Sequence, residues 1–218
     1  MPRRQSPHEA NLPVPGDFVA LVSRLQSDAI DILLGYIWQG LDGLKARGYR
    51  YESDQEDIER TITEGLAQEI RDVMTGYEPY YLEHGPHEHE TRSTANAQPP
   101  TYDLAFIFRR NPRAKWPIEA KVLKTDGVVA EYVKDVHGSY LNFRYAPFSS
   151  QAAMLGYLLG GRPARSLERI AEKLAIAMER HTSFPDRDHG VTHHTREVPA
   201  GKEYPQEFMC HHLIFLIN

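Results

Sequence analysis

The segment from Thr101 to Leu123 constrains the fold most, because it has the pattern of a β-hairpin with two largely apolar strands. Residues 101–108, TYDLAFIF, and 116–123, WPIEAKVL, are rich in the aromatic and β-branched side chains that favour strands. Between them, Asn111-Pro112 is a turn dipeptide, since proline fixes its own φ and biases the residue before it away from helix. The sequence therefore predicts two antiparallel strands that reverse near Asn111.

The register of this hairpin predicts that three charged side chains meet. If the chain folds at the predicted turn, opposed residues have numbers that sum to about 223. Asp103 then lies opposite roughly Ala120, within one position of both Glu119 and Lys121. Two carboxylates and a lysine are expected to be neighbours.

Side chains alternate along a strand, so each face of the hairpin can be described. The even-numbered positions form an apolar face: Leu104, Phe106, Phe108, Ile118, Ala120 and Val122. The three charged residues fall on the other face, which is also largely apolar: Ala105, Ile107 and Leu123. Charges among apolar neighbours need a partner or a metal ion. A salt bridge from Lys121 is the alternative, although it explains one carboxylate more easily than two.

An amphipathic helix is predicted upstream, over the segment SDQEDIERTITEGLAQEIRDVM. Its apolar positions form one stripe: Ile58, Ile62, Leu66, Ile70 and Val73. Glu59 and Glu69 lie within this stripe, whereas Glu64 points to solvent. Ser53 and Glu56 have the spacing of a capping box, which assigns Glu56 a structural role.

The Asp103 and Glu119-x-Lys121 pattern resembles the signature of the PD-(D/E)XK nuclease superfamily, although Tyr102 stands where the superfamily name leads one to expect proline. The resemblance implies a restriction-endonuclease-like fold, a mixed β-sheet core flanked by helices. It also implies that Asp103 and Glu119 bind Mg²⁺, or Mn²⁺ in its place, and that Lys121 orients water or stabilises the transition state. Members usually carry a further acid on the preceding helix. Glu59 is the candidate, with Glu69 as the alternative.

A third stretch of resemblance is NFRYAPFSSQAAMLGYLLGG, predicted to be an aromatic-rich approach to a short apolar helix. Ser149 or Ser150 would cap this helix and the final glycine pair would end it. Gln151, near its start, is a candidate to contact nucleic acid or metal-bound water, or else a solvated side chain. With the terminal strand HHLIFLIN, the segment is similar to small nucleases of bacterial anti-phage loci. This implies the effector of a defence or restriction system.

The net charge of −5 and the isoelectric point near 6.1 argue mildly against binding a polyanion. Local basic residues are nevertheless candidates to contact DNA phosphates: Arg109, Arg110, Arg113 and Lys115 at the hairpin tip, and Arg144 between two aromatic residues. A solvated turn is the alternative. We therefore expect a homo-oligomer, or a partner subunit such as a sensor or ATPase, to contribute to DNA binding.

Length and composition predict one α/β domain, since 218 residues with 41% apolar and 25% charged side chains can bury a sizeable core. Residues 1–16 are polar and proline-rich and are expected to be a flexible tail. Residues 17–218 are expected to form one nuclease domain, with a helical extension over 17–48 and a catalytic core over 53–218. The extension would cover the sheet or dock a second copy.

Further elements are predicted from periodicity. Phe18 to Ala46 has helical spacing, and its three glycines are possible breaks: Gly35, Gly40 and Gly43. A short helix is expected over Gly127 to His137. SLERIAEKLAIAMERH is predicted to be an amphipathic helix with Leu167, Ile170, Leu174 and Met178 facing inward. A buried strand is expected over Ile214 to Ile217.

Other features bear on location and metal chemistry. No apolar run approaches the length of a membrane span, and Cys210 is the single cysteine, so a cytoplasmic protein without an internal disulfide is expected. His87 and His89 would project their rings to one side of a strand, as zinc ligands can. Their surroundings, LEHGPHEHETRSTANAQPP, are more typical of a loop.

These observations predict a Mg²⁺-dependent deoxyribonuclease, an endonuclease rather than an exonuclease, that hydrolyses phosphodiester bonds. The alternative is a catalytically inactive protein with the same fold, which acts as a protein-binding or structural subunit of a larger complex. The complete set of two acids and a lysine favours the first interpretation, and the acidic net charge favours the second.

Overall fold

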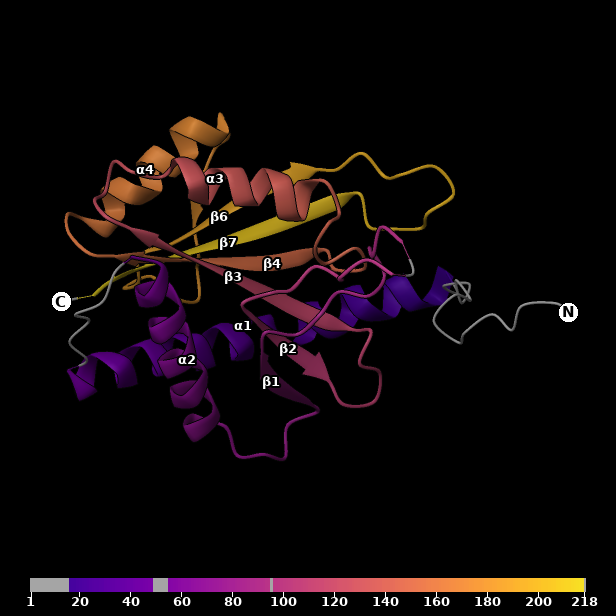
Figure 1. The fold of residues 1–218 in the computed structure, drawn as a ribbon, viewed down its shortest axis with the longest axis horizontal. Helices are drawn as coiled ribbons and strands as arrows, with labels where there is room; N and C mark the ends of the chain where they lie inside the picture. Colours follow the sequence, from indigo (N-terminus) through magenta and orange to yellow (C-terminus); the bar gives the residue numbers. More distant parts are fainter. Residues whose placement is uncertain (1–15, 49–54, 95, 218) are drawn as a thin grey trace, which may run out of the picture.

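The computed structural model describes residues 16–48, 55–94 and 96–217, which form a seven-stranded mixed sheet with helices on both faces (Figure 1). The order of strands in the sheet is β1-β2-β3-β4-β7-β6-β5. The strands are β1 (Tyr80–His84), β2 (Leu104–Phe108), β3 (Lys115–Leu123), β4 (Gln151–Leu158), β5 (Glu179–Arg180), β6 (His189–Thr195) and β7 (Glu207–Leu216). The expected α/β class is confirmed.

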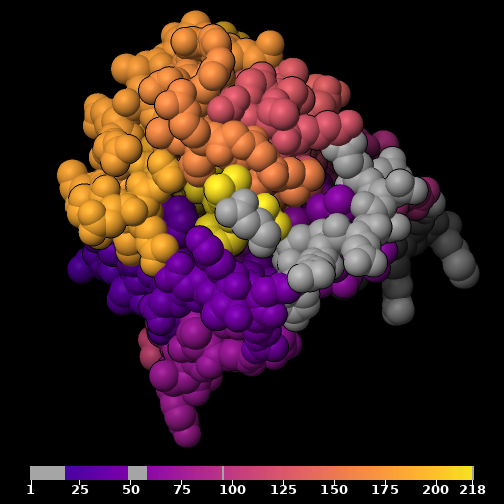
Figure 2. All heavy atoms as spheres, turned by 90° about the vertical axis from the view of Figure 1, so that its left-hand side faces the viewer, coloured from indigo at the N-terminus to yellow at the C-terminus, as the bar shows by residue number. Residues whose placement is uncertain are grey.

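Two helical layers enclose the sheet. The helices are α1 (Gly16–Arg47), α2 (Gln55–Val73), α3 (Ala130–Asp135) with its π-helical continuation η1 (Val136–Leu141), and α4 (Pro163–Leu174). Figure 1 shows α1 and α2 on one side of the sheet and α3 and α4 on the other. In the side view of Figure 2, the indigo and purple layer of α1 and α2 lies below the orange layer, with the yellow C-terminal residues between them.

The predicted hairpin is confirmed as β2 and β3, which pair antiparallel. Leu104 opposes Ile118 and Phe106 opposes Trp116, so opposed numbers sum to 222, one less than expected. Extended by one residue, this register sets Asp103 across from Glu119. The even-numbered face packs against α1 and α2, as the alternation predicted.

Helix α1 is continuous, so its glycines do not break it. They allow close packing instead, because a Cβ at Gly40 would lie 2.7 Å from Cγ1 of Ile70 in α2. A Cβ at Gly43 would likewise collide with the Glu69 carboxylate. The amino-terminal helix thus covers the sheet and packs against α2. The expected tail, residues 1–16, lies outside the described residues except for Gly16, which begins α1.

The stripe predicted on α2 is largely confirmed: Ile58, Ile62, Leu66 and Ile70 are buried. Val73 is 37% exposed, because it is the last residue of the helix and faces away from the core. The predicted capping pair, Ser53 and Glu56, lies outside the described side chains.

The prediction of a helix after Ser149 and Ser150 is wrong, since residues 151–158 form strand β4. All of its residues are buried, because β4 lies between two parallel neighbours, β3 and β7, with helices over both faces. A strand buried on both faces has a continuous apolar sequence without alternation. Such a run cannot be told from a buried helix by periodicity.

Other elements follow the predictions with changed bounds. The short helix expected over Gly127 to His137 is α3 with η1, and the terminal strand is the longer β7. The amphipathic helix α4 is shorter than expected, because Ala175 adopts a left-handed conformation with φ of 53°. Leu167 and Ile170 face the core as predicted, whereas Met178 lies beyond the helix.

Candidate active site

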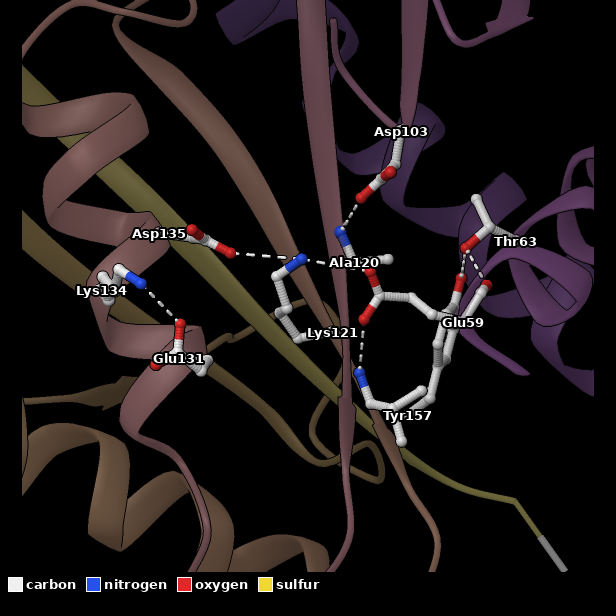
Figure 3. Close-up of polar contacts among 10 residues, drawn as sticks. Glu59, Thr63, Asp103, Ala120, Lys121, Glu131, Lys134, Asp135 and Tyr157 are labelled. Atoms are coloured by element: carbon white, nitrogen blue, oxygen red, sulfur yellow. Dashed lines mark hydrogen bonds and ion pairs between the residues drawn. The ribbon is translucent and has the colours of Figure 1, made fainter. Parts of the chain in front are cut away.

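The free edge of β3 positions the candidate site. β2 pairs with β3 no further than Ile118, whereas β3 continues toward its carboxyl end. Here side chains take the place of a neighbouring strand, because Ala120 N donates to Oδ2 of Asp103 at 2.7 Å and Val122 N donates to Oε2 of Glu59 at 3.0 Å (Figure 3). Two carboxylates are thus held at this edge by backbone N–H groups.

Lys121 lies between two carboxylates from different helices (Figure 3). Its Nζ is 3.1 Å from Oε1 of Glu59 in α2 and 3.3 Å from Oδ2 of Asp135 in α3. Burial alone would lower the pKa of Lys121, but Glu59 and Asp135 raise it above its usual value. Lys121 is therefore a fixed cation that can donate hydrogen bonds, and it is not a base at neutral pH.

Glu119 is the least satisfied member of the cluster. Its side chain lies on the same face of β3 as Lys121, and the residue is 7% exposed. Oε2 is buried and has no hydrogen-bond partner among the described residues. A buried carboxylate oxygen without a partner is expensive to maintain, unless a bound cation satisfies it.

The pKa values of both hairpin carboxyl groups are raised. Burial raises the pKa of Asp103 to about 6, although the hydrogen bond from Ala120 opposes the shift. Burial also raises the pKa of Glu119 well above its usual range, and the neighbouring charge of Asp103 adds to this. The two carboxyl groups repel each other when both are ionised.

The charge of the cluster fits a divalent cation. Four carboxyl groups surround one ammonium group: Asp103, Glu119, Glu59 and Asp135 around Lys121. The two acids beside Lys121 already neutralise it, and among the described residues neither Asp103 nor Glu119 forms an ion pair with a cation. Carboxylate oxygens are hard ligands that suit Mg²⁺ or Mn²⁺. Asp103 and Glu119, with its unpartnered Oε2, are the residues that would hold the ion.

A cleft of about 380 Å³ opens next to this cluster. Its lining combines α2 with the segments around β1 and before β2: Glu59, Arg60, Thr63, His84, Gly85, Thr101, Tyr102 and Asp103. Arg60 is exposed and pairs with the exposed Glu64. The cleft thus gives solvent and ligands access to both Asp103 and Glu59.

The raised pKa of Asp103 predicts a pH dependence. A carboxyl group whose pKa is about 6 folded and near 3.8 unfolded binds a proton on folding, so the metal-free protein loses stability as pH rises through that window. Asp103→Asn removes this contribution while keeping an acceptor for Ala120 N. We expect the difference in melting temperature, wild type minus Asp103→Asn, to decrease as the pH is raised from about 4 to about 6.

Saturating Mg²⁺ should reverse this trend, because the ion binds the ionised carboxylates and its affinity rises with pH. Melting curves across the window, with and without Mg²⁺, check both expectations. A difference that stays flat, or that rises with pH in the absence of metal, would show that folding does not raise the pKa of Asp103.

Most of the basic residues expected to bind DNA are engaged within the chain. Arg113 pairs with Glu90, while Arg109 and Lys115 donate to backbone carbonyl groups. The other two candidates are exposed: Arg110 and Arg144. The four at the hairpin tip lie at the opposite end of β3 from Lys121. The carboxylate cluster therefore gains no cation from the hairpin tip.

Two further candidates lie elsewhere. Gln151 was expected at the start of a helix, but it is the first residue of β4, is 8% exposed and meets Nε2 of His211 at 3.1 Å. Its side chain is not at the carboxylate cluster. Glu69, the alternative helix acid, forms an ion pair with Arg47 of α1 and is thus a packing residue. Of the two helix acids, Glu59 is the one that reaches Lys121.

Sequence reasoning missed two sets of residues. Asp135 contacts Lys121 from α3, which the sequence predicted as a helix without any indication that it faces the hairpin. A group of three histidines also gathers in the sheet: His181, His189 and His211. The sequence drew attention instead to His87 and His89, whose rings are 5.9 Å apart and lie in the predicted loop.

No helix among residues 16–48, 55–94 and 96–217 has the length and apolar character needed to span a membrane. Comparisons with protein families, with curated proteins and with solved structures found no match for the chain.

Proposed function

We propose that this chain is a metal-dependent nuclease with a restriction-endonuclease-like fold, which hydrolyses phosphodiester bonds in DNA. The observation that carries the proposal is the meeting of Asp103, Glu119 and Lys121 at the free edge of β3, where Glu119 keeps a buried oxygen without a partner. Their order and spacing resemble the PD-(D/E)XK pattern. A role as the effector of an anti-phage or restriction system rests on that resemblance alone.

Asp103 and Glu119 are the proposed ligands of Mg²⁺. When bound, the ion would polarise the scissile phosphate and lower the pKa of the attacking water. Asp103 is already oriented by the N–H of Ala120, and its position on the cleft gives it access to solvent. Glu119 supplies the second carboxylate from the sheet side. Their mutual repulsion in the absence of metal favours binding of the cation.

Lys121 is the proposed electrostatic group. Its ammonium is kept protonated by Glu59 and Asp135, so it can donate a hydrogen bond to the attacking water or to a phosphate oxygen. Glu59 also accepts from Val122 N, which fixes the distance between α2 and β3. We assign Glu59 and Asp135 the task of holding Lys121 in place.

Binding of DNA is proposed to need more than this chain alone. The net charge is −5, and three of the five basic candidates are committed to contacts within the chain. Affinity for nucleic acid comes mainly from free Lys and Arg near phosphates. A second copy or a partner subunit, such as a sensor or ATPase, would supply them, so a low activity of the isolated chain is expected.

The alternative proposal is an inactive subunit of a larger complex. It is favoured by the contacts that Glu59 and Asp103 already make with the backbone of β3, and by the neutralised Lys121. Glu119 argues against it, because a purely structural cluster has no use for a buried acid without a partner.

Digestion of DNA by the purified chain tests the proposal. Supercoiled plasmid and linear DNA are incubated with Mg²⁺, Mn²⁺ or a chelator, beside the variants Asp103→Ala and Lys121→Ala. We expect metal-dependent nicking of the closed plasmid by wild type, as for an endonuclease, and none by either variant. Cleavage that persists in both variants would place the activity elsewhere or in a contaminant.

Glu59→Gln is expected to reduce cleavage by about 10- to 100-fold, as typically happens when an outer-shell partner of a metal site is lost. The amide keeps an oxygen for Val122 N but no longer pairs with the ammonium of Lys121. Glu64→Gln is the control, since Glu64 lies on the solvent side of the same helix and pairs with Arg60. Initial rates of plasmid cleavage should fall for Glu59→Gln and stay at the wild-type value for Glu64→Gln. Equal rates for the two would exclude a role for Glu59.

A further inference from the structure

A cluster of three histidines lies on the face of the sheet that α1 covers. One ring nitrogen from each of His181, His189 and His211 lies within 4.8 Å of the others. They come from three places in the sequence: the residue after β5, the start of β6 and the middle of β7. Trp38 of α1 packs against the ring of His189 on this face. Lys121, by contrast, is paired with α3 on the opposite face.

The inner pair already has the spacing of two ligands on one ion. Nε2 of His189 is 3.2 Å from Nδ1 of His211, in a hydrogen bond whose proton an ion would replace. Two imidazole nitrogens bound to a tetrahedral zinc ion at about 2.0–2.1 Å are separated by roughly 3.4 Å. The nitrogen of His181 lies within 4.8 Å of the other two, and its ring stacks on that of His189 with the ring centroids 4.4 Å apart, so His181 would have to move closer to ligate the same ion.

Hydrogen-bond partners orient the rings. Oε1 of Gln151 accepts from Nε2 of His211 at 3.1 Å, which leaves the Nδ1 lone pair of His211 directed at His189. At the other side, Nε2 of His181 is 3.7 Å from the carboxylate of Asp31, and Ser183 N donates to its Nδ1 at 3.3 Å, so an ion bound through Nδ1 would displace the contact with Ser183. Ligating histidines commonly hold their second nitrogen against a carbonyl or carboxylate group in this way. Gln151, which the sequence offered as a candidate to contact nucleic acid or metal-bound water, thus orients the ring of His211 instead.

The three rings differ in their access to solvent. His189 and His211 are each 1% exposed, whereas the side chain of His181 is 11% exposed.

We infer that His181, His189 and His211 form a zinc site, separate from the carboxylate cluster and independent of the proposed nuclease activity. Three imidazoles suit Zn²⁺ or another late transition metal, and they do not suit Mg²⁺. Water would complete the tetrahedron. The ion would tie the β5–β6 edge of the sheet to β7, which pairs with the central strand β4.

Zinc titration of the untagged full-length chain tests this inference. The protein is stripped with a chelator, placed in excess Mg²⁺ to occupy the carboxylate cluster, and titrated with Zn²⁺ by calorimetry. We expect a single tight site in wild type. His181→Asn and His211→Asn should weaken it by more than about 100-fold, and Gln151→Leu by about 10- to 100-fold. Co²⁺ should give the visible spectrum of a tetrahedral site.

His193→Asn is the matched control, because His193 lies on β6 with His189 but is exposed. The affinity of His193→Asn for Zn²⁺ should equal that of wild type. At a free Zn²⁺ concentration about 100 times Kd, the melting temperature of wild type should rise by about 5–10 °C, and that of His181→Asn should not. His181 is partly exposed, so this variant remains informative if His211→Asn does not fold. Absence of Zn²⁺ binding by wild type, or equal binding by His181→Asn, would overturn the inference.

Discussion

Replacing Glu119 with glutamine is expected to abolish metal-dependent cleavage without lowering the stability of the protein. The substitution removes a ligand charge, and we expect cleavage to fall by about 100- to 1,000-fold or more. It also removes a buried carboxyl group whose pKa is raised by burial and by the charge of Asp103, and whose Oε2 has no hydrogen-bond partner among the described residues. The free energy of unfolding should stay the same or rise by about 1 kcal/mol. Initial rates on plasmid and urea unfolding in metal-free buffer measure the two effects.

Glu69→Gln is the matched control for this variant. Glu69 is as buried as Glu119, with 6% against 7% exposure, but it pairs with Arg47 between α1 and α2. Its loss should lower stability and leave cleavage unchanged. The two variants are thus expected to behave in opposite ways. If Glu119→Gln destabilised the protein as Glu69→Gln does, and cleavage persisted, then Glu119 would be a structural residue.

Of the substitutions at the carboxylate cluster, Lys121→Met is expected to destabilise the metal-free protein most. It is also expected to abolish cleavage. Methionine keeps much of the apolar stem but leaves the carboxylates of Glu59 and Asp135 without their cation. Removal of one partner from a fully buried pair costs about 3–5 kcal/mol, and these side chains are about one quarter exposed, so we expect about 2–3 kcal/mol. Urea unfolding at neutral pH without metal measures the loss.

Lys134→Met provides the comparison, because Lys134 lies beside this cluster in Figure 3 and pairs with the exposed Glu131. Surface pairs of this kind contribute about 0–1 kcal/mol. Mg²⁺ should recover part of the stability of Lys121→Met, since an ion held by Asp103 and Glu119 would reduce the negative charge beside Glu59 and Asp135. A loss for Lys121→Met no greater than that for Lys134→Met would show that Lys121 does not hold the cluster together.

The hairpin and its charged residues could be predicted because the information is local. Alternation of apolar residues and the Asn111-Pro112 turn determine both the strands and their register to within one residue. Asp103 and Glu119 therefore had to be neighbours. Glu59 was found by a similar local argument, since a helical stripe predicted that it would face inward. What the local pattern did not predict is that Glu59 and Asp103 also pair with the free edge of β3.

The rest of the sheet depends on contacts between distant segments. β4 has no polar face, so its sequence carries no period that separates a strand from a buried helix. Asp135 reaches Lys121 only because α3 crosses between the parallel strands β3 and β4. The three clustered histidines lie just after β5, in β6 and in β7, and no spacing in the sequence relates them. Their meeting follows from strand order, which the sequence alone did not predict.

Calorimetric titration of Mg²⁺ into the metal-free chain tests the central claim most directly. At a pH well above 6, where Asp103 is ionised in the folded protein, wild type should bind Mg²⁺, and both Asp103→Asn and Glu119→Gln should lose the binding. Glu69→Gln should bind as wild type does. Binding of Mg²⁺ with equal affinity by all four proteins, or the absence of binding by folded wild type with either Mg²⁺ or Mn²⁺, would contradict the assignment of this cluster as a metal-dependent active site.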